Sequence, residues 1–131
     1  MRATRLAWIV AHAFVGWALC FATIGVGMAV TTVNNALIVH AIAAPLFFIG
    51  VSWLYFHRFP EAGPLATATE FAALVMTMDF FVVALLILHS LAMFASLLGT
   101  WIPFALIWAA TYLTGWWLVQ RPKPASPARH A

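Results

Sequence analysis

Four long apolar runs, separated by three short breaks, dominate the pattern of side chains along this chain. A helix needs roughly 20 apolar residues to cross a bilayer, and each run approaches or exceeds that length. The breaks read TTVNN after residue 30, HRFPEAGPLATATE from residue 57, and LGT before residue 101. The pattern therefore predicts four membrane-spanning helices at about residues 6–30, 36–56, 71–98 and 101–119.

Composition agrees with this pattern. The chain is 66% hydrophobic and only 7% charged, whereas soluble domains average about 25% charged residues. A small soluble domain exposes too much of its surface to hide so many apolar side chains. The first run is also longer than the roughly 7–15 residues of a signal-peptide core. We therefore expect residues 1–119 to form an all-α integral membrane four-helix bundle with up-down topology, surrounded by the lipid bilayer.

Charged residues are confined to the ends of the chain and to one loop. Residues 6–57 contain no Asp, Glu, Lys or Arg, and residues 71–120 contain only Asp79. With four spans, all the basic residues fall on one side, so the positive-inside rule predicts that both termini are cytoplasmic. The expected location is a bacterial cytoplasmic (inner) membrane, with a disordered cytoplasmic tail at residues 120–131. No basic stripe suited to nucleic acid is present.

Two helix starts carry capping residues. Thr67 and Glu70 fit the capping box, in which the Thr hydroxyl and the Glu carboxylate satisfy backbone N–H groups of the first turn. Thr100 stands in the position that caps the fourth span, and Pro103 is tolerated in its first turn. The third helix is therefore predicted to begin near Thr67.

The first span carries a face of small residues at 4-3-4-3-4 spacing, which we call the small-residue face. Close approach of helix backbones in a membrane depends on such residues. The face packs against another helix of this chain or forms a self-association surface, and the sequence leaves both open. Its members are Ala11, Ala18, Ala22, Gly25 and Ala29, with Val15 between them.

Two ionisable residues, His12 and Asp79, lie within the apolar runs on the predicted cytoplasmic half. Counting from the predicted span entries places His12 roughly 9 Å deep and Asp79 roughly 12 Å deep. An imidazole N–H bonded to the carboxylate would relieve the cost of burying both groups. We therefore predict a polar pair of His12 and Asp79, which serves as a structural clamp or as part of a proton or small-solute path.

His40 and His89 lie in the opposite half of the predicted bundle. They are about 8 Å and 15 Å below the neighbouring turns, a mismatch of roughly 7 Å. Met93 follows His89 by four residues, on the same face of the predicted helix. Imidazole and thioether side chains ligate haem or metals, so these three residues are the candidate ligands for haem b or a metal ion.

The segment DFFVVALLILHSLAMFASLLGTWIPFALIWAATYLTGWW, residues 79–117, resembles the second hairpin of short four-span bacterial membrane proteins to which no activity is attached. PLATA, residues 64–68, and HAIAAP, residues 40–45, are similar to that group as well. The resemblance covers most of the chain. It implies the four-span fold and carries no functional residues with it.

No catalytic constellation is found in the apolar runs, which lack paired carboxylates and metalloprotease-type motifs. The leading hypothesis is a non-enzymatic scaffold or accessory subunit of a membrane complex, whose partners are other membrane subunits or a second copy. One alternative is a haem- or metal-binding redox protein that uses His40 and His89. The other is proton or small-solute conduction through the region of His12 and Asp79.

Overall fold

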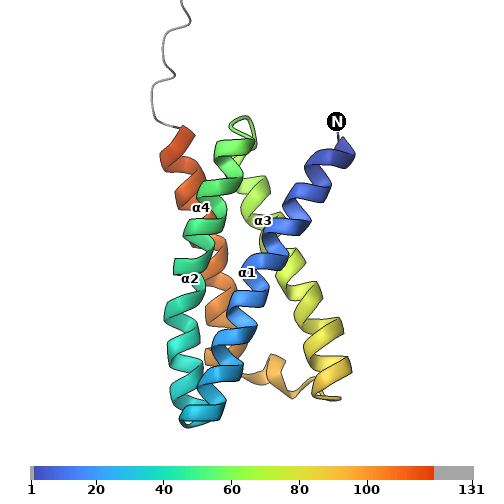
Figure 1. Ribbon diagram of the computed structural model, residues 1–131, viewed down its shortest axis with the longest axis vertical. Helices are drawn as coiled ribbons and strands as arrows, with labels where there is room; N and C mark the ends of the chain where they lie inside the picture. The colour runs from blue at the N-terminus through green and yellow to red at the C-terminus, as the bar shows by residue number, and fades with distance from the viewer. Residues whose placement is uncertain (1, 120–131) are drawn as a thin grey trace, which may run out of the picture.

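The protein is all-helical in the computed structural model, which describes residues 2–119 (Figure 1). Four helical stretches are each long and apolar enough to cross a membrane, as the hydrophobic pattern predicts. The predicted tail at residues 120–131 lies outside the described residues. The elements in chain order are α1 (Arg2–Val30), α2 (Val33–Arg58), α3 (Pro64–Met78), η1 (Asp79–Ile87), η2 (Ala92–Ala95), η3 (Leu97–Trp101) and α4 (Ile102–Val119).

Successive helices run in opposite directions, so the start of α1 and the loop between α2 and α3 meet at one end of the bundle (Figure 1). We call this the charged end, because it carries Arg5, Arg58 and Glu70. α1 packs on α2 and α3, and α4 packs on α2 and α3, so the four helices enclose one core. Large rings fill this core, including those of Phe48 and Tyr55, which are fully buried.

Helices approach closely where a glycine faces a bulky ring. A Cβ atom added at Gly16 of α1 would lie 2.5 Å from Cζ of Phe48 on α2, and one added at Gly115 of α4 would lie 2.5 Å from Cζ of Phe56. Packing contacts of this kind hold membrane helices together, because lipid tails leave little hydrophobic drive for association. A buried hydrogen bond from Ser52 to Thr111, 3.1 Å long, adds a polar contact between α2 and α4.

The small-residue face predicted on the first span is not an internal contact. Ala11, Ala22, Gly25 and Ala29 are exposed, and Ala18 is only partly buried. The bundle is built on a different face of α1, because the ring of Phe48 and its neighbours fit against Gly16 rather than against this face. Self-association through the small-residue face stays a prediction. The buried face of α1 consists of Ile9, Ala13, Gly16, Trp17 and Cys20.

The third span differs most from its prediction. Its helix begins at Pro64, and at Asp79 the backbone changes from α-helix to the wider π-helix of η1. The helix ends at Ile87 rather than at Leu98. Its end is followed by His89, whose φ of 50° lies in the left-handed region that helices do not continue through. Residues 88–96 therefore form bends and the short turn η2 instead of three more helical turns.

Side chains from the fourth span hold this irregular segment in place. The hydroxyl of Thr100 donates to the carbonyl of Met93 at 2.5 Å, and the indole N–H of Trp101 donates to the carbonyl of Phe94 at 2.8 Å. Thr100 is therefore not the predicted helix cap. That position belongs to Ser96, whose hydroxyl accepts a hydrogen bond from the Gly99 N–H at 2.9 Å.

The predicted capping box of Thr67 and Glu70 is not formed either. α3 begins three residues before Thr67, with Gly63 at the cap position and Pro64 in the first turn, where its missing N–H leaves no partner unsatisfied. Thr67 thus lies inside α3, and the side chain of Glu70 bonds Arg5 of α1. The proline was the stronger start signal because it fixes the backbone angle that a helix needs.

Candidate functional site

The polar side chains of α1 and α3 form two layers at different depths in the bundle. The first layer lies at the charged end, where Nη2 of Arg5 donates to Oε2 of Glu70 at 2.9 Å. Both side chains are about two-fifths exposed, at 40% and 41%. This ion pair joins the beginning of α1 to the second turn of α3, and its two residues are 65 positions apart in the sequence.

Two fully buried hydroxyl groups accompany this first layer. Within residues 2–119, the Thr67 hydroxyl meets no hydrogen-bond partner, whereas the Tyr55 hydroxyl lies near the guanidinium of Arg5. The rings of His12 and Tyr55 pack edge to face, with centroids 5.6 Å apart. Thr67 precedes Glu70 by three residues, close to one helical turn. Buried polar groups are normally hydrogen-bonded, so these hydroxyls mark a polar region of the interior.

The second layer lies deeper and consists of Trp17 and Asp79. Nε1 of Trp17 donates to Oδ1 of Asp79 at 2.8 Å. The Trp17 side chain belongs to the core, whereas Asp79 is only partly buried. Asp79 follows Glu70 by nine residues, so it lies roughly 13 Å farther from the charged end. If the four apolar helices cross a bilayer, a carboxylate at this depth is costly and needs partners.

The predicted pair of His12 and Asp79 is not formed. Nδ1 of His12 instead bonds the carbonyl of Trp8, 2.8 Å away on its own helix. The residue of α1 that faces Asp79 is Trp17, five residues or roughly 7.5 Å beyond His12. The depth estimate failed because the helices begin at Arg2 and Pro64, well before the apolar runs from which depth was counted. Trp17 was missed as a donor, although a buried indole N–H usually finds a partner.

An apolar layer separates the two polar layers. It contains fully buried aromatic rings, and those of Phe48 and Phe71 pack edge to face with centroids 6.0 Å apart. Because these side chains fill the interior, the polar groups do not form a continuous chain from Glu70 to Asp79. The layer consists of Ile9, Ala13, Phe48, Phe71 and Val75, all buried.

The candidate haem or metal ligands are not brought together. His40 is buried in α2, and its Nδ1 has no hydrogen-bond partner within the described residues. His89 is exposed and follows η1, which lies on the opposite side of α1 from α2 in Figure 1. Met93 lies in η2, so the helical spacing that would place it beside His89 is lost. Residues 2–119 contain no group of three or more His, Cys, Asp or Glu side chains that could hold a metal ion.

No protein-family model, no curated protein and no solved structure matches this chain. The resemblance to short four-span bacterial proteins therefore stays a prediction. The two polar layers, and the point at which the third span changes its helix type, are the features from which a function can be inferred.

Proposed function

We propose that this protein is a non-enzymatic scaffold or accessory subunit of a larger membrane complex. In this proposal the four apolar helices cross the inner membrane of a bacterium, and the charged end lies in the cytoplasm with both termini. The concentration of basic residues at one end of the bundle supports this orientation. The wide exposed surface of apolar side chains supports contact with lipid and with other membrane helices.

One observation carries the proposal, namely the partly exposed carboxylate of Asp79 where the third span becomes a π-helix. An ionised carboxylate offers about four acceptor sites, and the Trp17 indole fills one of them. Lipid tails donate no hydrogen bonds, so a partly exposed Asp79 is unfavourable for a chain that is alone in a bilayer. A neighbouring subunit that contacts this side would complete the environment of Asp79.

The two alternative functions have less support from the geometry. Redox chemistry at a bis-histidine site needs facing imidazoles, but His40 is buried in α2 whereas His89 is exposed in the irregular segment after η1. Conduction needs a polar route, and the layer around Phe48 and Phe71 interrupts it. The accessory-subunit proposal needs neither feature.

The test is the protein mass of the particle that contains this chain in its own membrane. The chain is tagged, produced at its natural level, extracted with its lipids into polymer nanodiscs, and analysed by light scattering. We expect a protein mass well above the 14.4 kDa of one chain, with a second polypeptide in fixed proportion. A particle that contains a single chain and no other protein would refute the proposal.

A further inference from the structure

We infer that a transmembrane helix of a different protein docks beside Asp79, and that this helix presents a hydrogen-bond donor at the depth of Asp79. The docking surface, which we call the α1–η1 face, is defined by Trp17, Phe21 and Asp79. The inference rests on the proposed function and deepens it, because it assigns the surface and the chemistry of the partner.

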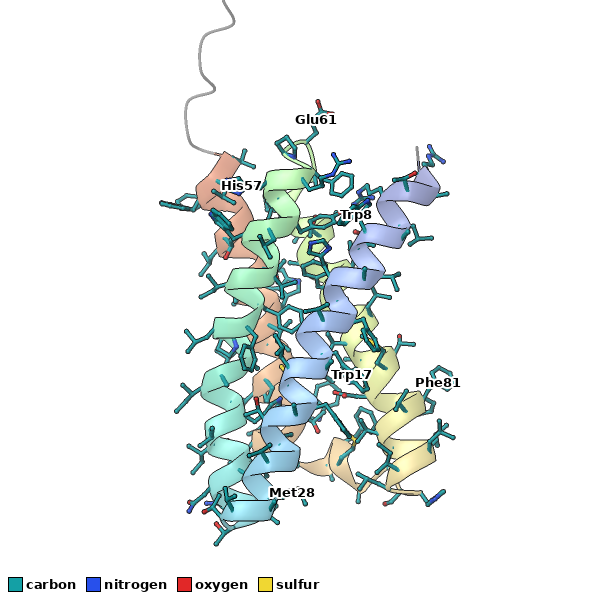
Figure 2. The ribbon with its side chains drawn as sticks, viewed as in Figure 1. Trp8, Trp17, Met28, His57, Glu61 and Phe81 are labelled. Atoms are coloured by element: carbon teal, nitrogen blue, oxygen red, sulfur yellow. The ribbon has the colours of Figure 1, made fainter. Side chains whose placement is uncertain are left out.

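The first argument is the way in which the third span leaves the bundle. α3 packs on α1 and α4, but beyond Asp79 the chain diverges from α1 (Figure 1). In the described chain η1 does not pack closely along α1 or α4, and its contact with the core is made by Val82 and Val83. Figure 2 shows Trp17 between α1 and the third span, with Phe81 on the outer side of η1.

The second argument is the helix type at this position. π-helical stretches are rare, and they are often found at functional sites. The π-helix of η1 begins at Asp79 itself, so the polar group and the change in helix geometry coincide. The ring of Phe21 stacks on that of Trp17, the hydrogen-bond donor to Asp79, with centroids 5.5 Å apart, and Phe21 remains 43% exposed. An aromatic surface with a polar group next to it suits a helix that offers both packing and one hydrogen bond.

The third argument explains why the docking helix belongs to a different protein and not to a second copy of this chain. A second copy would need an exposed donor at a similar depth. The exposed hydroxyls nearest in sequence to Trp17 and Asp79 are already engaged, since Thr23 donates to the Leu19 carbonyl at 2.8 Å and Thr77 donates to the Ala73 carbonyl at 2.7 Å. His12, the nearest imidazole on α1, lies roughly 7.5 Å closer to the charged end than Trp17 and bonds the Trp8 carbonyl. The donor therefore belongs to a different protein, as an Asn, Gln, His, Lys or Arg in its apolar helix, because these side chains donate to a carboxylate.

The experiment uses a photocrosslinking residue in the full chain in its own membrane. Benzoylphenylalanine replaces Phe21 on the α1–η1 face or, as a control, Leu46 on α2, which is 62% exposed. Leu46 lies two residues from Phe48, which contacts α1 at Gly16, so the control probe has a depth similar to that of Trp17. We expect the probe at Phe21, and not the probe at Leu46, to give one protein adduct. Its crosslinked peptide should belong to an apolar helix with a donor side chain.

The adduct should also depend on Asp79. A hydrogen bond between membrane helices contributes enough that Asp79→Leu should lower the yield about 3- to 30-fold. Leu86→Ala, a change at an exposed position of η1, should leave the yield unchanged. Cys20 is buried, so its slow reaction with a thiol reagent shows in each variant that the bundle is still folded.

Three results would overturn the inference. They are an adduct between two copies of this chain, an adduct with lipid alone, and a protein adduct that Asp79→Leu does not affect. If the nanodisc mass still shows a second polypeptide, the proposed function stands and only the assignment of the face fails. If the mass shows a single chain, both fail together.

Discussion

Replacing Gly16 by alanine should destabilise the bundle, although alanine is the better helix former. Gly16 lies inside α1, where alanine is favoured over glycine by roughly 0.5–1 kcal/mol. The added Cβ would, however, lie 2.5 Å from Cζ and 2.8 Å from Cε2 of Phe48. The ring cannot withdraw freely, because Phe48 is fully buried and packs against Phe71.

The two effects have opposite signs, and the steric one is larger. Overpacking a well-filled core costs about 1–3 kcal/mol. After the gain in helix propensity is subtracted, we expect a net loss of roughly 0–2.5 kcal/mol for Gly16→Ala. The matched control is Gly25→Ala on the same helix, where no atom lies within 4 Å of the added Cβ. That variant should be unchanged or up to about 1 kcal/mol more stable.

Cys20 provides the assay, because it is the chain's single cysteine and is buried. A fluorogenic thiol reagent reports unfolding in detergent as a function of temperature or denaturant, without a further label. Combining Gly16→Ala with Phe48→Leu should recover part of the lost stability, because a leucine side chain is smaller and can move away from the added Cβ. If Gly16→Ala is as stable as Gly25→Ala, the contact between Gly16 and Phe48 does not limit the approach of α1 and α2.

Three further predictions concern polar and backbone features. Ser52→Ala and Thr111→Val should each cost about 0.5–1.5 kcal/mol, and the double variant should cost less than the sum, as a thermodynamic cycle would measure. His89→Gly should raise stability by about 0.5–1 kcal/mol in the same unfolding assay, because φ is 50° at this position, whereas His89→Val should lower it. Exchanging the charges of Arg5 and Glu70 should retain stability, while either single charge removal should cost less than about 1 kcal/mol, and less still at high salt.

The sequence predicts four helices long and apolar enough to cross a membrane, because the length of each apolar run decides this. A bilayer demands about 20 apolar residues with internally satisfied backbone groups, and this requirement is local. Residues 88–96 include His89, Ser90 and Ser96, but they remain apolar enough to continue the run, so run length alone does not mark Ile87 as the end. Hydrogen bonds from Thr100 and Trp101 to the carbonyls of Met93 and Phe94 hold that segment. The spacing of apolar residues does not predict such tertiary contacts.

The candidate site was predicted in part. The sequence singled out Asp79 as a carboxylate within an apolar run, but its partner depends on helix register, which shifts by 1.5 Å for every residue of error in a helix start. Gly16 illustrates a second limit, because it lies outside the small-residue face and yet makes the close contact. Spacing shows which residues share a face of a helix, whereas the neighbouring helix decides which face is used.

The ion pair of Arg5 with Glu70 also constrains the order in which the chain assembles during its synthesis. Arg5 and Trp17 belong to the first helix, and their partners follow 65 and 62 residues later. At about 5–20 residues per second, roughly 3–13 s pass before those partners leave the ribosome. Meanwhile α1 and α2 can already pack together through Gly16 and Phe48. The first helical hairpin therefore forms through apolar contacts alone. The polar contacts then recruit the third helix to a hairpin that already exists.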